Sequence, residues 1–344
     1  MKILFYAWDI YDESLKEMQL KPNGGRIAIR NICEYVGRKC EVHLFLGQKK
    51  LPSKRLGHIQ VVDTMRFPDL TDESLDQNEC RLRTMLNAFE NTIKELKPDF
   101  VNLHGIGELT RRCIFKCIEM RQPYAFTDHL YIGLEKEVPG YHSSVEWEKQ
   151  IFTIPEIKIT TVSNTMKSNI LRDYSMIKET DIELILNGTD FTYAKEESDL
   201  REHYNLAGKK ILLCIGTILQ RKNQIQIVHA FANMTEEEKH DLVVIFCGND
   251  TMNGALQEEI KKFGLEKHLI YIGTVLNSHI KKYYSISDGY ILPSIAEGLS
   301  LTMLEAMVFG LPLIMFHDIE GASDLANEQV VQFIYGKEDR DVAD

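Results

Sequence analysis

Short apolar runs of four to six residues alternate with longer helical segments along most of the chain. Strands that alternate with helices in this way form parallel βαβ units, so the pattern predicts an α/β fold with parallel sheets. A first series of such runs lies at residues 3–6, 41–46, 100–103, 124–127, 158–162 and 183–186. A second series lies at residues 210–215, 242–246, 269–272, 289–292 and 313–316.

The polar segment 195–210, which is rich in Glu, Asp and Lys, separates the two series. A chain of 344 residues also exceeds what one hydrophobic core usually serves. We therefore predict an N-terminal domain at residues 1–190 and a C-terminal domain at residues 191–344, both Rossmann-like, doubly wound sheets with the ligand in the cleft between them. The final residues, 337–344, resemble the start of another helix, which predicts that the natural protein continues beyond them.

The balance of charge limits the partners of the chain. The sequence carries 40 Lys and Arg against 51 Asp and Glu, a formal net charge of -11 at pH 7. A nucleic-acid surface needs clustered Lys and Arg to displace counterions, so we expect no nucleic-acid partner. A single nucleotide remains compatible with this composition.

The cysteines and the short apolar runs predict a cytoplasmic protein. The seven cysteines are odd in number and form no C-x-x-C pair or zinc spacing, so we expect free thiols in a reducing compartment. The apolar run 3–8 is far too short to span a membrane. The basic segment 49–55 has two interpretations: a solvated loop, which we favour, or a weak peripheral contact with the anionic inner face of a membrane.

A glycine pair follows the first predicted strand and precedes a helical pattern that begins near Arg26. In the order Asn23, Gly24, Gly25, it would let backbone N–H groups at a helix amino terminus approach a phosphate. The alternative is a plain turn at the start of a helix. The G-x-G-x-x-G fingerprint is absent after the first strand, which argues against an NAD enzyme.

The segment 293–312 is predicted to contain a strand end, a glycine turn, a helix and a glycine stop. Glu297 in the loop and Glu305 in the helix can address two ends of one elongated ligand, and the backbone N–H groups of residues 298–301 between them suit a diphosphate. Both glutamates also have a simpler interpretation: Glu297 as a helix-start charge and Glu305 as a solvated helix residue. The apolar neighbours of Glu305 favour a functional partner for it.

This segment resembles the P-S-x-x-E-G-x-x-x-x-x-x-E-A-M-x-x-G-x-P signature of the retaining glycosyltransferases of family 4. The resemblance extends over nearly the whole chain, because further segments match the family in the same order. They are residues 23–25, 98–105, 127–129, 162–163, 187–190, 215–216, 221–222, 248 and 272–275. The ordered set is far more specific than any one of its members. It implies a GT-B fold, in which two Rossmann-like domains face a central cleft.

The resemblance also implies a reaction: retaining transfer of a hexose from a nucleotide diphosphate sugar to a glycan, lipid-linked or protein acceptor, without a cofactor or a protein-bound metal. Glu305 would hold the ribose hydroxyls, Glu297 a hydroxyl of the transferred sugar, and Lys222 the leaving diphosphate. His129 matches the family histidine near the sugar, although a structural hydrogen bond is an alternative for it. The other expected donor-binding residues are Gly24, Gly25, Arg221, Gly298, Leu299, Ser300 and Leu301.

Two departures from the family keep other functions open. Thr217 stands where the family usually has Arg, so half of its diphosphate clamp is missing unless Arg221 replaces it. The segment 317–322 lacks the usual Gly-Gly turn. The alternatives to a transferase in polysaccharide, glycolipid or glycoprotein assembly are a non-catalytic sugar-nucleotide-binding module and a GT-B nucleotide-sugar epimerase.

Overall fold

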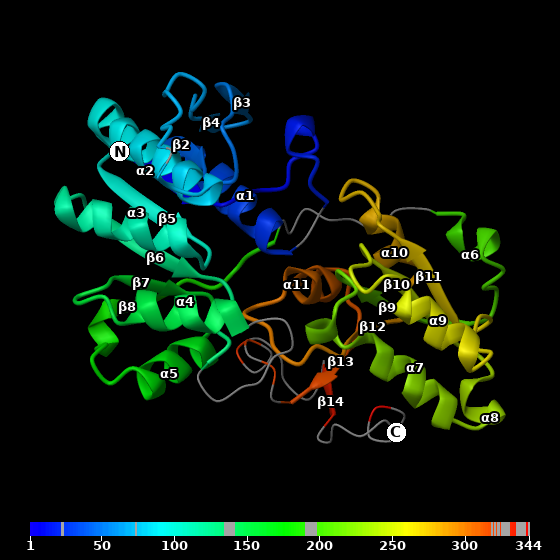
Figure 1. The fold of residues 1–344 in the computed structure, drawn as a ribbon. Helices are drawn as coiled ribbons and strands as arrows, with labels where there is room; N and C mark the ends of the chain where they lie inside the picture. The colour runs from blue at the N-terminus through cyan, green and yellow to red at the C-terminus, as the bar shows by residue number, and fades with distance from the viewer. Residues whose placement is uncertain are drawn as a thin grey trace.

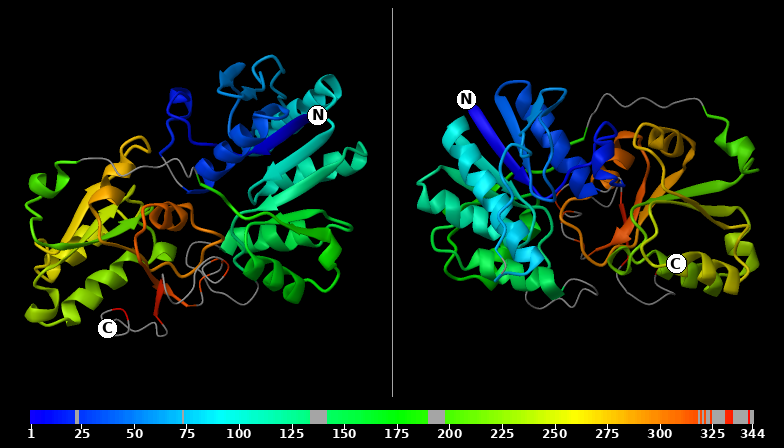
Figure 2. Two further views of the ribbon diagram at one scale, coloured as in Figure 1. Left: turned by 180° about the vertical axis from the view of Figure 1, so that it is seen from behind. Right: turned by 45° about the horizontal axis from the view of Figure 1, so that its top comes forward.

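A computed structural model describes residues 1–21, 24–72, 74–133, 142–189 and 198–317, together with residues 319, 321, 324, 331–334 and 342. Two α/β domains stand side by side, each built on its own sheet (Figures 1 and 2). The first sheet contains strands between residues 2 and 184, and the second contains strands between residues 210 and 334. The predicted domain boundary at residues 190 and 191 lies outside the described residues.

The N-terminal sheet has the strand order β3-β4-β2-β1-β5-β6-β7-β8, and all its neighbouring strands are parallel except the hairpin β3–β4. The chain begins with β1 in the middle of this sheet. It places β2, β3 and β4 on one side of β1 and then β5 to β8 on the other side. The strands are β1 Lys2–Ala7, β2 Glu41–Leu46, β3 Lys54–Leu56, β4 Ile59–Val61, β5 Phe100–His104, β6 Tyr124–Asp128, β7 Ile159–Thr161 and β8 Ile182–Leu184. The helices are α1 Gly24–Gly37, α2 Gln77–Leu96, α3 Glu108–Glu119, α4 His142–Phe152 and α5 Asn164–Asp173, with short 3-10 turns η1 Lys16–Met18 and η2 Glu179–Asp181.

The C-terminal sheet has the parallel order β11-β10-β9-β12-β13-β14, which is the doubly wound order 3-2-1-4-5-6. Its switch point lies between β9 and β12. The strands are β9 Lys210–Ile215, β10 Leu242–Cys247, β11 Leu269–Gly273, β12 Gly289–Leu292, β13 Leu313–Phe316 and β14 Val331–Ile334. The helices are α6 Leu200–His203, α7 Gln224–Asn233, α8 Glu236–Lys239, α9 Ala255–Lys262, α10 Ile280–Ile286 and α11 Leu301–Val308, with the 3-10 turn η3 Gln220–Lys222.

Alternate residues of β1 show why helices cover both faces of the N-terminal sheet. Leu4 and Tyr6 belong to one buried cluster, and the Tyr6 ring packs edge-on against Phe89 of α2. Ile3 and Phe5 belong to a second cluster on the opposite face, with residues of α1. A strand that is apolar at every position is buried on both sides, as in a doubly wound sheet.

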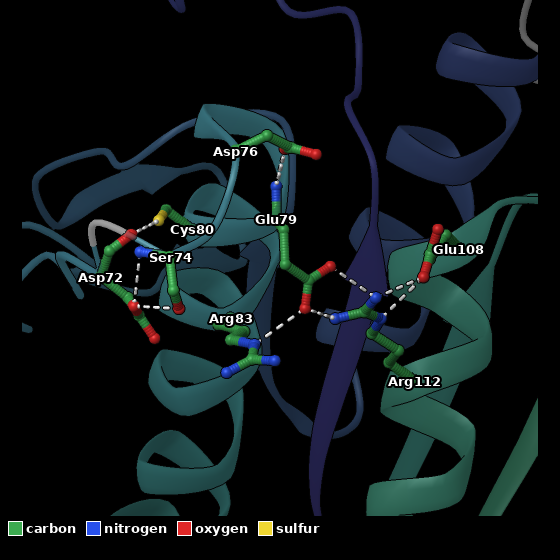
Figure 3. A network of polar contacts seen from close by, with 8 residues as sticks. All are labelled: Asp72, Ser74, Asp76, Glu79, Cys80, Arg83, Glu108 and Arg112. Atoms are coloured by element: carbon green, nitrogen blue, oxygen red, sulfur yellow. Dashed lines mark hydrogen bonds and ion pairs between the residues drawn. The ribbon is translucent and has the colours of Figure 1, made fainter.

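Polar contacts fix the amino termini of α2 and α3 on one face of that sheet (Figure 3). The Asp76 side chain caps α2 by accepting a hydrogen bond from the Glu79 N–H at 2.8 Å. The Glu79 carboxylate in turn accepts two hydrogen bonds from the Arg112 guanidinium of α3, at 2.9 and 2.8 Å. Arg112 also pairs with Glu108 in the first turn of α3. This bidentate geometry is the strong form of an Arg–carboxylate contact.

The predicted strands were found, several at the predicted bounds, but the sequence analysis missed β3, β4 and β14. The interpretation of 49–55 as a solvated loop was wrong for Lys54 and Arg55, which pair with β4. Runs of three or four residues interrupted by a charged or amide side chain carry too little periodicity to be recognised. Apart from residue 342, the C-terminal segment 337–344 lies outside the described residues. Among the helices that the structure describes, none combines the length and apolar character needed to cross a membrane.

Candidate active site

A cavity of about 360 Å³ lies between the two domains. Its walls come from the start of α1, the segment after β6, and the segments that follow the carboxyl ends of β9, β10, β11 and β12. Such strand ends are the expected ligand-binding edge of open α/β sheets. All the predicted site residues line this one cavity: Gly24, Gly25, His129, Arg221, Lys222, Glu297, Gly298, Leu299, Ser300, Leu301 and Glu305.

The segment from β12 to α11, here called the donor loop (residues 293–300), is buried except for partly exposed Ile295. Ser300 caps α11 by accepting a hydrogen bond from the Met303 N–H. Gly310 has φ +69 and ends the helix in the left-handed conformation, as the sequence predicted. Leu301, the first residue of α11, lines the cavity, so the amino terminus of this helix lies at the cavity wall.

Gly298 is required by a close approach between the two domains. A Cβ atom on Gly298 would lie 2.0 Å from the backbone carbonyl oxygen of His129. That distance is impossible, so any larger residue would push the donor loop away from the segment after β6. The Asn187 side chain adds a second contact to the loop, because its amide donates to the Leu299 carbonyl at 3.0 Å.

Glu297 and Lys222 contact each other directly. The Lys222 ammonium lies 2.5 Å from Glu297 Oε1, and the Arg221 guanidinium lies 3.4 Å from the same oxygen. Burial works to raise the pKa of Glu297, but the charges of Lys222 and Arg221 outweigh it and hold the pKa at about 2. Glu297 is only 6% exposed and remains negatively charged at neutral pH. Burial lowers the pKa of Lys222 from its usual range, and the charge of Glu297 opposes that change.

Glu305 has a different environment in the same cavity. It is also 6% exposed, and its Oε2 accepts a hydrogen bond of 2.7 Å from the Tyr284 hydroxyl. Burial raises the pKa of Glu305 to about 7, and the Tyr284 hydrogen bond only partly opposes this. A carboxyl with such a pKa changes charge near neutral pH.

His129 is buried at the amino-terminal side of the cavity. Its Nε2 lies 2.8 Å from His104 Nδ1, and the two rings stack at 5.1 Å between centroids. The Phe5 ring also packs against His104, with 5.6 Å between ring centroids. Burial lowers the pKa of His129 to about 4, so its ring is neutral at pH 7. His129 Nδ1 has no hydrogen-bond partner among the described residues.

The glycine pair has a different place from the one predicted. Helix α1 begins at Gly24 rather than near Arg26, so both glycines belong to the first turn of the helix. A Cβ on Gly24 would meet no atom of the described residues within 4 Å, and no close approach among them explains the glycine there. Asn23 lies outside the described residues.

Comparisons with known proteins identify the C-terminal half. Residues 195–343 match the family model described as "Glycosyl transferases group 1". The C-terminal domain is therefore similar to the group 1 glycosyltransferases. Curated relatives include an uncharacterized glycosyltransferase of Methanocaldococcus jannaschii, 22% identical over 52% of this chain and 46% of that protein. The alpha-D-kanosaminyltransferase of Streptomyces kanamyceticus is 28% identical over 38% of this chain and 33% of that protein. The match thus spans less than half the length of these relatives.

Solved structures extend the likeness to both domains. The sucrose-phosphate synthase of Thermosynechococcus elongatus superposes with a TM-score of 0.80 and 16% identity, covering 99% of this chain and 88% of that one. Anabaena HepE, solved in complex with UDP and glucose, has a TM-score of 0.72 and 16% identity, covering 100% of this chain and 88% of that one. The whole chain therefore has the GT-B fold.

Within the C-terminal domain, Thr217 lines the cavity, and its backbone carbonyl accepts a hydrogen bond of 3.1 Å from the Gln224 side chain. Arg221, the proposed replacement for the missing arginine, is buried and donates through Nη1 to the Ala296 carbonyl. Its guanidinium is therefore fixed against the donor loop, next to Glu297. Arg221 therefore lines the cavity, but its guanidinium already contacts the Ala296 carbonyl and Glu297 there.

Sequence analysis missed several residues that shape the site. Tyr284 reaches Glu305 from α10, and Tyr290 of β12 donates to the Thr302 hydroxyl at 2.6 Å. Neither tyrosine lies in a motif, so no local signal identified them. No group of three or more His, Cys, Asp or Glu that could hold a metal ion occurs within the described part of the chain.

Proposed function

We propose that this chain is a retaining glycosyltransferase that moves a hexose from a nucleotide diphosphate sugar to a glycan, lipid-linked or protein acceptor. The observation that carries the proposal is the content of the cavity between the domains. Two buried carboxylates, Glu297 and Glu305, lie in one cavity with the cations Arg221 and Lys222 and the amino terminus of α11. A nucleotide diphosphate sugar needs the same groups: acceptors for its hydroxyls and positive charge for its diphosphate.

In this proposal the nucleotide lies at the Glu305 end. The carboxylate accepts hydrogen bonds from the two ribose hydroxyls, while Tyr284 holds the other side of the carboxyl in place. The diphosphate lies at the amino terminus of α11, where the N–H groups of the first turn and the helix dipole favour negative charge. Anabaena HepE was solved with UDP and glucose, which supports a uridine nucleotide as the first donor to test.

The sugar lies at the Glu297 end. As its bond to the diphosphate breaks, the anomeric carbon becomes positive, and a fixed negative charge stabilises that state. Lys222 is paired with Glu297, so a bound diphosphate competes with Glu297 for this ammonium. Lys222 then neutralises charge on the departing phosphate oxygen, and neutral His129 offers a hydrogen bond to a sugar hydroxyl.

Further parts of the proposal concern the surroundings of the reaction. Lys222 and Arg221 supply positive charge at the diphosphate, so we propose transfer without a metal or cofactor. One curated relative is named O-antigen chain mannosyltransferase RfbU, which supports a role in polysaccharide, glycolipid or glycoprotein assembly. Such acceptors fit a cytoplasmic enzyme, with the basic segment 49–55 offering a weak contact at the inner face of a membrane.

A panel of nucleotide sugars tests the function in two steps. Thermal shift first identifies the donor, because ligand at about 100 times its dissociation constant adds about 2.7 kcal/mol to stability. Release of nucleoside diphosphate with the identified donor then supports a transferase. The observation that favours a non-catalytic module is Thr217. Stabilisation by a donor without any release of nucleoside diphosphate would establish that module instead, and interconversion of the donor sugar alone would establish an epimerase.

A further inference from the structure

Two buried carboxyls lie behind the segment after β6 and take no part in the proposed chemistry. Asp128 ends β6 and is 1% exposed, and Glu148 of α4 is 0% exposed. Asp128 Oδ2 and Glu148 Oε2 have no hydrogen-bond partner among the described residues. A buried carboxylate oxygen without a donor is unfavourable, and buried charged groups are normally paired.

The other oxygen of each carboxyl holds the backbone of residues 129–133, here called the β6 loop. Asp128 Oδ1 accepts a hydrogen bond from the Leu130 N–H at 3.2 Å. Glu148 Oε1 accepts one from the Ile132 N–H at 3.1 Å, across from helix α4. The two acids therefore clamp the same short loop from two different elements.

The β6 loop is the part of the N-terminal domain that meets the donor loop. Its first residue, His129, lines the cavity, and the His129 carbonyl lies where only a glycine fits at position 298. Its Ile132 side chain is buried in a cluster with Ala296, the residue before Glu297. A shift of the β6 loop would therefore move His129 and the wall beside Glu297 together.

The surroundings of the two acids favour protons over negative charge. Burial raises the pKa of both carboxyls, and the charge of Asp128 raises the pKa of Glu148 further. The ionisable groups facing Glu148 from α5 and the loops are Asp173, Tyr131 and Tyr174, and Asp173 adds to the same shift. The backbone N–H groups that the acids accept from oppose it only partly.

We propose that Asp128 and Glu148 are protonated acids that act together as positioning residues, holding the β6 loop against the donor loop. This inference rests on the proposed function, because the loop carries His129 to the sugar end of the cavity. When these protons are lost to solvent, the two buried carboxylates are negative and repel each other. One of them turns toward water and releases its backbone N–H, so His129 and the wall beside Glu297 lose their fixed position.

The loss should affect transfer more than nucleotide binding. The β6 loop borders the sugar end, whereas Glu305 and Tyr284 belong to the C-terminal domain alone. We expect kcat of the wild type to fall as pH rises from roughly 6 to 9, the range that raised carboxyl pKa values make accessible. The affinity for nucleoside diphosphate should show no matching fall over this range.

Glu148→Gln tests the proton on Glu148 directly. The amide keeps an acceptor for the Ile132 N–H, but it does not titrate. We expect its kcat at pH 9 to exceed that of the wild type by about tenfold, since a single lost proton changes a rate by up to tenfold per pH unit. Glu148→Ala removes the clamp and should lower kcat at every pH. Glu146→Gln, with a side chain 64% exposed on the same helix, is the matched control and should follow the wild type.

Thermal unfolding without substrate separates this proposal from the proposed function. Acids with raised pKa values stabilise the fold at low pH and lose that contribution as pH rises through the folded pKa. The melting temperature should therefore fall more between pH 6 and about 9 for the wild type than for Glu148→Gln. Equal pH slopes for these two proteins would show that Glu148 carries no proton in this range and would overturn the proposal, whether or not any donor is turned over. A folded Glu148→Ala variant with wild-type kcat would overturn the positioning role. If Glu148→Ala does not fold, the pH profiles of kcat for Glu148→Gln and Glu146→Gln still test the proposal.

Discussion

The loop before α11 and the helix itself each carry one buried glutamate, and the two side chains have opposite electrostatic surroundings. In the loop, Glu297 is paired with Lys222 and lies near Arg221, and its pKa is about 2. In the helix, Glu305 has the Tyr284 hydroxyl as its hydrogen-bond donor, and burial raises its pKa to about 7. Both are 6% exposed, so the depth of burial does not separate them.

The difference shows that neighbouring cations decide which buried acid keeps its charge. Glu297 is charged throughout the neutral range and is suited to stabilise a positive transition state. Glu305 gains its full charge only when pH rises or when hydroxyl donors arrive. The same residue type can therefore act as a permanent charge at the sugar and as a titratable acceptor at the ribose.

Glu297→Gln should cause the largest change, because it removes the permanent charge while keeping the size of the side chain. We expect kcat to fall by about 10²-fold or more, the scale for losing one electrostatic stabiliser. The affinity for nucleoside diphosphate should rise, since Lys222 is released from its partner. Steady-state kinetics and calorimetry on the same folded variant measure both. Unchanged turnover would show that Glu297 only pairs with Lys222 and does not stabilise the transition state.

Glu305→Ala should weaken nucleoside diphosphate binding without a sugar present. Losing a charged acceptor in a buried site costs on the order of 1.5 to 3 kcal/mol, which is about 10- to 150-fold in Kd. Glu305→Gln is the control and should lose less, because an amide still accepts one hydrogen bond. If every nucleotide tested binds both variants as tightly as the wild type, Glu305 does not meet the ribose.

The pH dependence of nucleotide affinity should follow Glu305. Hydroxyl donors favour the charged carboxylate, so binding releases a proton and affinity rises with pH until the pKa of about 7 is passed. We expect about a tenfold gain between pH 6 and 8, measured by calorimetry in buffers of different ionisation enthalpy. Without ligand the sign is reversed: the raised pKa stabilises the fold at low pH, and this contribution is lost as pH rises through 7. If nucleotide affinity of the Glu305→Gln variant depends on pH as it does in the wild type, another group causes this pH dependence.

Thr217→Arg should have the smallest effect. A new cation at the cavity wall, where the family usually has arginine, should tighten diphosphate binding by a few-fold, on the order of 1 kcal/mol or less. Thr217→Gln provides a neutral side chain of comparable length as the control. Equal affinities for the two variants would show that Arg221 and Lys222 already neutralise the diphosphate.

Local patterns in the sequence predicted much of this protein. Alternating apolar runs predicted eleven of the strands, because strand period and helix period are properties of short segments. The motif around residues 293–312 predicted a loop, a helix and a glycine stop, and Gly310 ends the helix in the left-handed conformation. All the site residues that the motifs predicted line one cavity.

The contacts that set the chemistry were decided only by the tertiary structure. Glu297 meets Lys222 because the turn after β9 and the loop after β12 converge at the switch point of the second sheet. Position 298 requires glycine because the carbonyl of His129, in the other domain, approaches it. Tyr284 reaches Glu305 from a helix without any motif. Each contact joins segments far apart in the chain, and their distance and charge follow from the packing of whole sheets rather than from any local period or turn preference.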